Sequence, residues 1–203
     1  MMPRALLTRQ LDRSAGDCVV LTFDDGPHPE VTPEVLDRLD AHEARAVFFI
    51  VGRRAERAPH LLEAIQDRGH LLGNHTYLHS NGRQTRFSNY YHDLQKCQLL
   101  IEKHAGKKPK LFRPALGTIS LTTLITPKLL DLKTISWSVE AKDWKCRTPE
   151  EALFAAQSLI YQLGPRDIIL LHDDNPLVLQ ILDIILPTIK NRRYDICSGI
   201  HYL

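Results

Sequence analysis

Two adjacent carboxylates, Asp24 and Asp25, follow an apolar run at residues 18–23 and precede the turn formers Gly26 and Pro27. Neighbouring carboxylates repel each other when both are ionised, so a fold that keeps them together needs a compensating charge. A bound cation is the simplest compensation, because it lowers the pKa of one acid and gives the two carboxylates separate roles. The pair therefore indicates metal-assisted acid–base chemistry, although an acid pair at a turn is more often a solvated or capping feature.

Two histidines further along the chain, His75 and His79, are candidate ligands for such a cation. Their His-x-x-x-His spacing puts both imidazoles on one face if the segment is helical. Asp25 and these two side chains make a His-His-carboxylate set that leaves coordination positions open for water and substrate. The spacing alone is a weak signal, because many such pairs are incidental surface residues.

Three later segments contain further polar candidates: Arg113 opens an Arg-Pro-Ala-Leu-Gly stretch, Asp143 precedes Trp144, and His172 ends a Leu-Leu-His stretch. Each also has an ordinary structural explanation. These are a strand-ending turn, a surface acid beside a core aromatic side chain, and a buried strand with a polar end. Their significance therefore depends on whether the fold brings them together.

Short β-rich runs alternate with amphipathic stretches along the whole chain. The β-rich runs predict strands at Cys18–Phe23, Ala46–Val51, His70–Asn74, Leu111–Arg113, Thr134–Val139, Asp167–His172 and Tyr194–Cys197. The amphipathic stretches predict helices near Pro33–Ala41, Pro59–Arg68, Asn89–His104, Ser120–Leu130, Pro149–Leu163 and Pro176–Asn191. This alternation indicates an α/β fold with parallel strands, and a doubly wound open sheet and a barrel fit it equally well.

The polar candidates favour a barrel, because they fall at the carboxyl ends of different predicted strands. In a (β/α) barrel those ends converge on one rim, where the chemistry of such folds is built. With 203 residues the chain is short for eight full units, which need roughly 250 residues. We therefore predict a single-domain, distorted and incomplete (β/α)7 barrel. The predicted catalytic domain is residues 18–203, preceded by an N-terminal segment of residues 1–17.

The composition is typical of a soluble globular protein, with 43% apolar and 25% charged residues. A formal net charge of +2 is too small to indicate nucleic acid as the main partner, and the basic cluster at residues 107–110 is interpreted as a solvated loop. The four cysteines form no CxxC pair, which favours buried or free thiols in a reducing compartment. The sequence has no recognisable transmembrane segment or signal peptide, so we expect a cytoplasmic protein, or a periplasmic or secreted one if a leader was removed.

Taken together and in this order, the five polar segments closely resemble the polysaccharide deacetylase family, also called carbohydrate esterase family 4 or the NodB-homology domain. The family pattern is Thr-Phe-Asp-Asp-Gly, His-Ser/Thr-x-x-His, Arg-x-Pro-x-Gly or a close variant, Asp-x-x-Asp-Trp, and Leu-x-His. The resemblance runs from about Val19 to Cys197, nearly the whole chain. Five motifs at consistent strand ends make it a strong signal.

The resemblance implies a role for each acid and histidine of the first two motifs. Asp24 is the expected general base for the attacking water. Asp25, His75 and His79 are the expected ligands of a divalent metal ion, most often zinc, with cobalt or nickel as alternatives. The ion supplies electrostatic activation, and Asp24 supplies the proton acceptor.

The later motifs imply the remaining parts of the site. Arg113 is expected to orient Asp24 and to keep it ionised through a charge-assisted hydrogen bond. His172 is the expected general acid, oriented by Asp143. The residues expected around the acyl group and the sugar, including a backbone oxyanion donor, are Leu116, Trp144 and Leu170.

Two positions depart from the usual family pattern. Leu116 stands where an aromatic side chain is frequent, and Glu140 stands where aspartate is frequent. A backbone donor survives the first change, although aromatic packing against a sugar weakens, and the second change keeps the negative charge. Neither change removes a proposed ligand, base or acid, so we expect altered substrate preference and retained catalysis.

The leading hypothesis is a metal-dependent hydrolase that removes N-acetyl groups from amino-sugar glycans of the chitooligosaccharide, peptidoglycan or exopolysaccharide type. Its partner is then the glycan substrate. Two alternatives use the same water chemistry: a deformylase or deacylase of a lipid-linked sugar, and an O-acetyl xylan esterase. A non-enzymatic alternative is a glycan-binding protein that has lost turnover. The presence of both Asp24 and His172 argues against it, because binding needs neither a base nor an acid.

Overall fold

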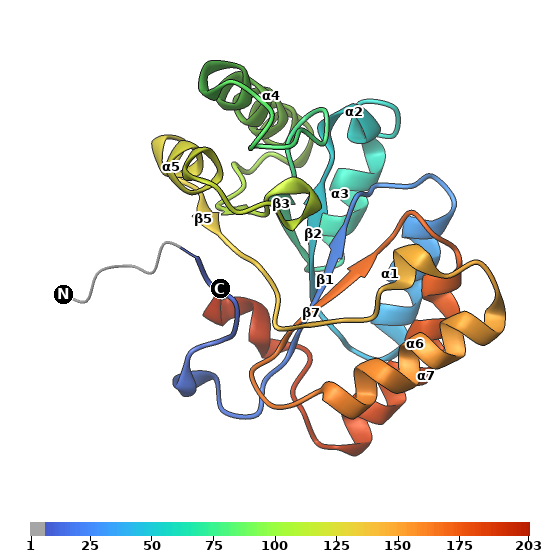
Figure 1. The fold of residues 1–203 in the computed structure, drawn as a ribbon. Helices are drawn as coiled ribbons and strands as arrows, with labels where there is room; N and C mark the ends of the chain where they lie inside the picture. Colours follow the sequence, from blue (N-terminus) through green and yellow to red (C-terminus); the bar gives the residue numbers. More distant parts are fainter. Residues whose placement is uncertain (1–6) are drawn as a thin grey trace.

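The computed structural model describes residues 7–203, which form a parallel sheet of seven strands surrounded by helices (Figure 1). The strands are β1 (Val20–Asp24), β2 (Ala46–Ile50), β3 (Leu71–Asn74), β4 (Leu111–Phe112), β5 (Lys133–Thr134), β6 (Val139–Glu140) and β7 (Ile168–His172). Their order across the sheet is β5-β4-β3-β2-β1-β7-β6. The predicted α/β fold with parallel strands is confirmed.

The central strands are buried on both faces, as expected for parallel strands whose sequences are continuously apolar. One face packs against the helices, where the rings of Phe23 and Phe48 stack with centroids 4.9 Å apart. The opposite face encloses a second apolar cluster that includes Val20, Val47 and Phe49. Alternate residues of each strand therefore fill two separate cores.

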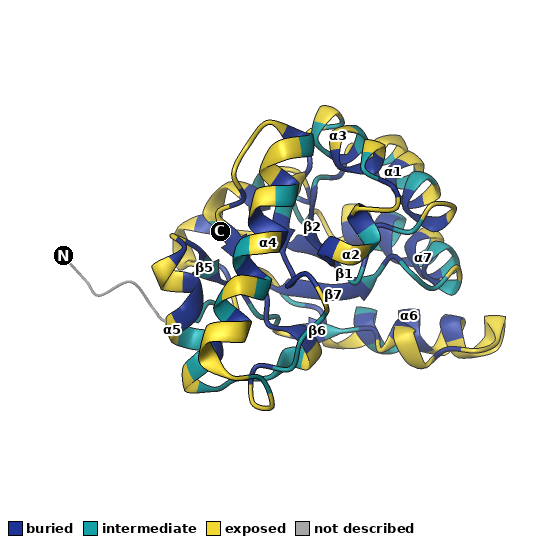
Figure 2. Ribbon diagram, turned by 90° about the horizontal axis from the view of Figure 1, so that it is seen from above, coloured by how far each residue is buried: buried dark blue, intermediate teal, exposed yellow. Residues whose placement is uncertain are grey.

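The helices are α1 (Val31–Ala41), α2 (Gly52–Ala55), α3 (His60–Asp67), α4 (Phe87–Ala105), α5 (Leu121–Leu129), α6 (Pro149–Gln162) and α7 (Leu177–Asn191). The six predicted helices are confirmed to within two residues at either end. Local capping explains this accuracy, because Ser120 and Thr148 each form a capping box at the start of a helix and Gly106 ends α4 in the left-handed conformation. Figure 2 shows the buried strands enclosed by helices whose outer surfaces are exposed.

One predicted strand, Thr134–Val139, is wrong. Its ends are two short strands, β5 and β6, at opposite edges of the sheet. Residues 135–138 between them, called here the crossing segment, carry the chain from one edge to the other (Figure 1). Ile135 is fully buried in the second apolar cluster. The segment therefore has the extended, half-apolar sequence of a strand, although it is not part of a continuous β-ladder.

The predicted strand Tyr194–Cys197 is also wrong. Asp195 forms an isolated bridge with Cys18, and its carbonyl accepts a hydrogen bond from the amide of Val19. The pairing goes no further, because the chain turns at Ser198 into a 3-10 helix that extends to Tyr202. The sheet still has seven strands because β5 and β6 replace one predicted strand with two.

The crossing segment makes the curled sheet an incomplete (β/α)7 barrel, as predicted. Near the N-terminus the amide of Thr8 donates to the carbonyl of Thr134, and the carbonyl of Thr8 accepts from the amide of Ser136. The first six residues of the predicted N-terminal segment lie outside the described part of the chain. Cys18, Cys97 and Cys146 are buried free thiols and Cys197 is an exposed one, as predicted for the thiols themselves. Residues 7–203 contain no helix with the length and apolar character needed to cross a membrane.

Candidate metal centre and acid–base site

The polar candidates lie at one rim of the sheet because each one ends or follows a strand. Asp24 and His172 are the last residues of neighbouring strands β1 and β7, and they are paired in the register of the sheet. His75 directly follows β3 and Arg113 directly follows β4. The parallel order of the strands therefore brings together residues that are far apart in sequence.

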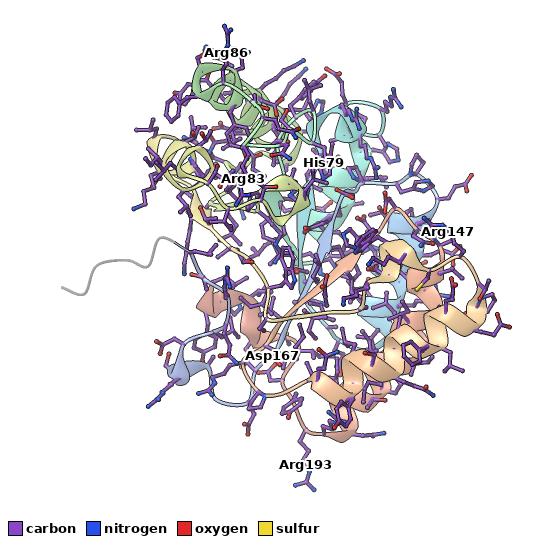
Figure 3. The ribbon with its side chains drawn as sticks, viewed as in Figure 1. His79, Arg83, Arg86, Arg147, Asp167 and Arg193 are labelled. Carbon is purple, nitrogen blue, oxygen red and sulfur yellow. The ribbon has the colours of Figure 1, made fainter. Side chains whose placement is uncertain are left out.

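Asp25, His75 and His79 form a group whose potential ligand atoms all lie within 4.8 Å of one another. The Oδ1 atom of Asp25 is 3.0 Å from Nε2 of His79 and 3.5 Å from Nε2 of His75. The two imidazole centroids are 5.2 Å apart. The structure thus brings the three predicted ligands together, and Figure 3 shows His79 close to the ends of the central strands.

The hydrogen bonds of this group fit a cation between its members. Nδ1 of His75 lies 2.8 Å from the carbonyl oxygen of Arg113, which can only accept, so Nδ1 carries the proton and Nε2 presents a lone pair. Oδ1 of Asp25 is buried and has no donor in hydrogen-bonding geometry, although His79 is close. Electron-rich atoms that face one another in a buried site are stabilised by a divalent ion, so these residues fit a metal.

Electrostatics keep Asp25 and His75 in their metal-binding forms. Burial raises the pKa of Asp25, but the close approach of the His79 imidazole, together with His75, outweighs it, and the net pKa is lowered. Burial lowers the pKa of His75. Asp25 is therefore ionised and His75 neutral around pH 7, the states in which they bind a cation.

The segment that carries the two histidines is a loop, so the helical explanation of their spacing is wrong. Thr76 and His79 adopt positive φ angles of 67° and 60°. The side chain of Asn74 stabilises this loop, since its Oδ1 accepts from the amide of Thr76 and its Nδ2 donates to the carbonyl of Leu94. Asn74 is a positioning residue that sequence reasoning did not single out, and its only signal was its place before the first histidine.

Asp24 has partners different from those of Asp25. Its Oδ1 accepts a 2.8 Å hydrogen bond from Nη1 of Arg113, and both side chains are almost completely buried. Its Oδ2 is 3.7 Å from Nε2 of His75 and makes no described hydrogen bond with the protein. One oxygen is therefore held by a cationic partner, and the other is available to a proton on a nearby water.

The guanidinium of Arg113 is itself held on several sides. It donates to Oγ1 of Thr22, to the carbonyl of Ser136 and, at 3.4 Å, to the carbonyl of Ile135. It also lies over the ring of Phe49, 4.2 Å from the centroid. Sequence reasoning missed these supports, because backbone carbonyls and a threonine inside a strand have no chemical signature in a sequence.

His172 and Asp143 form a second hydrogen-bonded pair. Nδ1 of His172 is 2.9 Å from Oδ1 of Asp143, and the amide of His172 donates to the other carboxylate oxygen. Burial alone would lower the pKa of His172, but the hydrogen bond and charge of Asp143, helped by Asp24 and Asp25, raise it to about 9. His172 is therefore cationic at neutral pH, with Nε2 as its second proton-bearing atom. Asn175, also missed from the sequence, donates to the carbonyl of Asp143 and fixes this pair.

The three predicted substrate-binding residues lie in different settings. Trp144 is half exposed and lines a cavity of about 560 Å³ that also reaches Asp25. Leu170 is buried in β7, two residues before His172 and thus on the same face of the strand. Leu116 is 66% exposed and has a positive φ of 58°. The structure places Trp144 in contact with the cavity at the metal centre and the other two along the rim.

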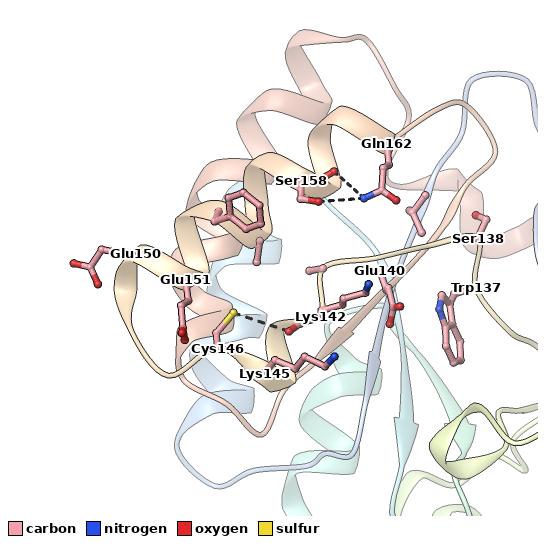
Figure 4. A pocket seen from close by; sticks show the side chains of 14 residues that line it. Trp137, Ser138, Glu140, Lys142, Lys145, Cys146, Glu150, Glu151, Ser158 and Gln162 are labelled. Atoms are coloured by element: carbon pink, nitrogen blue, oxygen red, sulfur yellow. Dashed lines mark hydrogen bonds between the residues drawn. The ribbon is translucent and has the colours of Figure 1, made fainter.

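A larger cleft of about 630 Å³ lies between β6 and α6 (Figure 4). Trp137, Glu140 and Lys142 line one side, and Ser158 and Gln162 of α6 line the other. It contains none of the three candidate ligands. Glu140, the position that departs from the family pattern, belongs to this cleft, so that departure leaves the metal centre unchanged.

Residues 12–135 match the family model described as polysaccharide deacetylase. The chain is 34% identical over 178 residues to a peptidoglycan-N-acetylglucosamine deacetylase of Bacillus cereus, a match that covers 86% of this chain and 64% of that protein. It is 35% identical over 159 residues to a chitooligosaccharide deacetylase of Azorhizobium caulinodans, with 78% and 74% covered.

A solved structure with the same fold is that of a protein from Bacillus anthracis described as a pseudoenzyme of carbohydrate esterase family 4. Its TM-score is 0.86 and its identity 25%, and the match covers 96% of this chain and 67% of that one. The likeness extends over nearly the whole chain. The fold alone therefore does not decide whether a member turns over substrate, and the side chains of the site must decide it.

Proposed function

The chain belongs to the polysaccharide deacetylase family, and we propose that it hydrolyses the N-acetyl group of an N-acetylated amino-sugar glycan, releasing acetate and a free amine. The observation that carries this proposal is the presence of two separately stabilised groups beside the candidate metal centre. Asp24 accepts a hydrogen bond from Arg113, and His172 is protonated against Asp143. Residues 18–203 are the proposed catalytic domain.

Asp25, His75 and His79 are the proposed ligands of a divalent metal ion. Two imidazole nitrogens and a carboxylate oxygen suit zinc, and they also accept cobalt or nickel. When bound, the ion lowers the pKa of water and polarises the acyl oxygen of the substrate. The Nδ1–H of His75 stays on the carbonyl of Arg113 and holds this ring in place.

Asp24 is the proposed general base. Arg113 holds its Oδ1, so Oδ2 takes the proton of the water that attacks the acyl carbon. His172 is the proposed general acid, because its Nδ1–H is held by Asp143 and its Nε2–H is free to protonate the leaving nitrogen. The proton taken by Asp24 and the proton given by His172 balance the cleavage of one C–N bond by one water.

Three residues near the site are the proposed substrate contacts. The backbone amide of Leu116 is a candidate donor to the developing oxyanion, since it belongs to the short 3-10 helix Ala115–Gly117 next to Arg113. Trp144 offers an aromatic face beside the cavity, and Leu170 offers an apolar surface on the His172 face of β7. With these assignments, the site recognises the acyl group of the substrate more than its glycan.

A second candidate function is glycan binding without turnover, which the structural likeness to a pseudoenzyme favours. Removal of an acyl group from a lipid-linked sugar and removal of O-acetyl groups from xylan remain alternatives with the same chemistry. Acetate release by the metal-loaded protein, followed by mass spectrometry on N-acetylglucosamine oligomers, acetylated xylan and acylated sugar lipids, distinguishes them. We expect release from the N-acetylated oligomers, and no release from any acylated glycan would refute the proposal.

A control variant separates catalysis from binding. Asp24→Asn removes the proton acceptor and keeps the size of the side chain, so we expect unchanged glycan affinity with turnover lost. If Asp24→Asn releases acetate at the rate of the unmodified protein, the proposed base is wrong.

A further inference from the structure

Helix α5 exposes aliphatic side chains and buries two threonines, the reverse of the usual distribution on a surface helix. Its outward side carries Leu121, Ile125 and Leu129, which are 78%, 45% and 60% exposed. Its inward side carries Thr123 and Thr126, which are fully buried, and the buried Pro127. An ordinary surface helix places apolar side chains inward and polar ones outward. We call the three outward residues, which follow one another at four-residue spacing, the α5 stripe.

Helix α5 is not simply a helix with apolar side chains on every side, because it also buries polar side chains. The hydroxyl of Thr126 is buried without a hydrogen-bond partner, so the chain tolerates a polar atom inside the helix while leucines face water. A row of exposed aliphatic side chains indicates a surface that binds another molecule or a membrane.

The same part of the molecule is strongly basic. Between residues 83 and 133 the sequence has ten lysines and arginines against three acids, whereas the whole chain has 26 against 24. The exposed basic residues of this region are Arg83, Arg86, Lys96, Lys103, Lys107, Lys108, Lys110 and Lys128. The three acids are Asp93, Glu102 and Asp131, and Asp131 pairs with Lys110. The remainder of the chain is consequently net acidic.

The positive charge lies on elements that contact α5. Lys128 belongs to the helix itself, and Arg83 donates to the carbonyl of Ile119 just before it. Figure 3 shows Arg83 beside α5 and Arg86 at an end of α4, the helix against which α5 packs. The loop that follows α4 supplies Lys107 and Lys108. The stripe is thus bordered by cationic side chains.

We infer that the α5 stripe docks on an anionic lipid surface. A helix with an aliphatic face bordered by lysine and arginine lies in the interface of a bilayer, where the apolar side chains enter the acyl boundary and the cations meet lipid phosphates. A second copy of this chain is the less favourable occupant, because it would place two basic surfaces against each other.

The docked orientation places the catalytic rim beside the lipid surface. In a barrel the helix that follows a strand starts at the rim, so Leu121 is at the rim end of the stripe and Leu129 is at the far end. Leu116, which is exposed on the rim, precedes the helix by a few residues. The site therefore opens next to the surface, with access to glycans held there. This docking does not depend on the proposed reaction.

Sedimentation with vesicles tests the inference. We expect the protein to sediment with phosphatidylglycerol vesicles at low ionic strength and to remain in solution with phosphatidylcholine vesicles. The triple variant Leu121→Gln, Ile125→Gln, Leu129→Gln keeps helix-forming side chains and should lower the partition coefficient about tenfold or more. Substitution of Lys107→Gln and Lys108→Gln should lower it and weaken its salt dependence.

A matched control uses exposed apolar residues on another helix. Leu153 and Tyr161 of α6 are 42% and 91% exposed, so Leu153→Gln with Tyr161→Gln removes comparable exposed apolar surface. Partition of this control should equal that of the unmodified protein, and thermal unfolding checks that all variants fold. Absence of binding to phosphatidylglycerol vesicles would overturn the inference. An equal loss in the α6 control, or binding that the α5 triple variant leaves unchanged, would also overturn it. A dimer that the α5 triple variant dissociates would assign the stripe to self-association instead.

Discussion

Asp24 and Asp25 are neighbours in sequence, but their carboxylates have separate partners. Oδ1 of Asp24 pairs with the guanidinium of Arg113, and Oδ1 of Asp25 faces the two imidazoles. The positive φ of 74° at Asp25 turns the backbone between them, so the second acid points to a different set of atoms. The electrostatic conflict inferred from the sequence is thus reduced because Arg113 neutralises Asp24, while Asp25 faces the candidate metal position.

This division predicts different losses for the two acids. Asp25→Ala should abolish both metal binding and activity, because it removes the one carboxylate among the three candidate ligands. Asp24→Asn should retain the metal and lower kcat by about 10²- to 10⁴-fold, the usual contribution of a general base. Metal content after dialysis, measured beside kcat, separates the two. Loss of metal from Asp24→Asn would show that this acid is a ligand.

The pair His172–Asp143 predicts a pH dependence. Since Asp143, helped by Asp24 and Asp25, raises the pKa of His172 to about 9, the proposed general acid is protonated at neutral pH and loses its proton as the pH rises through that value. Asp143→Asn removes the negative charge, so the pKa should fall toward the ordinary value of 6.5 and the alkaline limb of kcat/KM should move to lower pH. An alkaline limb that stays in place in this variant would exclude His172 as the group that titrates.

At the scale of elements, the loop after β1 is fixed by a buried acid beneath it. A Cβ atom on Gly26 would overlap the carboxylate of Asp173, which is fully buried and accepts a hydrogen bond from Thr32 of α1. The close approach of glycine to this carboxylate sets the path of the chain that carries Asp25. Glycine is required here because it has no Cβ atom and so leaves room for the carboxylate of Asp173.

Gly26→Ala should therefore displace this loop. We expect a loss of about 1–3 kcal/mol in the free energy of unfolding, as for overpacking at other buried sites, together with weaker metal binding. Chemical denaturation and metal titration measure the two effects. Gly164→Ala is the matched control, because the nearest atom to its added Cβ is 3.7 Å away. Equal behaviour of the two variants would contradict this account.

Elements whose signals are local could be predicted from the sequence, and those set by long-range contacts could not. The capping box of α6 and the apolar spacing of α6 and α7 define these helices through residues that are close in sequence. The crossing segment has the same local pattern as a strand, and only the distance between the two sheet edges reveals its role. Residues 75–79 likewise gave candidate ligands that the structure brings together, but with the wrong local structure, because a loop held by Asn74 places the two imidazoles side by side without a helix.

The candidate site was predictable as far as its side chains have distinctive chemistry. Acids, histidines and Arg113 are visible in a sequence, and the family resemblance assigns them roles. The carbonyls of Ile135 and Ser136 and the hydroxyl of Thr22, which hold Arg113, carry no such mark. The exposure of the α5 stripe also could not be predicted from the spacing of its apolar residues. That spacing is the same whether the stripe faces the core or the solvent.

At the scale of the whole molecule, the candidate ligands come from two distant parts of the chain, with Asp25 after β1 and the histidines after β3. A bound ion therefore stabilises the folded state by mass action, by about 2.7 kcal/mol at a free concentration of 100 times Kd. For a domain of this size, that corresponds to a rise in Tm of roughly 5 °C or more.

Removal of the ion by a chelator should abolish activity and lower Tm, with both restored by added zinc. Calorimetry and acetate release measure the two responses on the same samples. Asp25→Ala is the control, since a protein that no longer binds the ion should show no change in Tm on chelation. Full activity in the presence of chelator would contradict the proposed metal dependence.

The support of Arg113 by the crossing segment has a consequence for how the protein matures. The residues that carry the chain from one sheet edge to the other also provide the carbonyls that hold the guanidinium, and the guanidinium in turn holds Asp24. Until that crossing is in place, Asp24, the proposed base, lacks its anchored counter-ion. We therefore expect a partly unfolded chain to lack the proposed hydrolytic activity, which requires the crossing segment to be in its folded position.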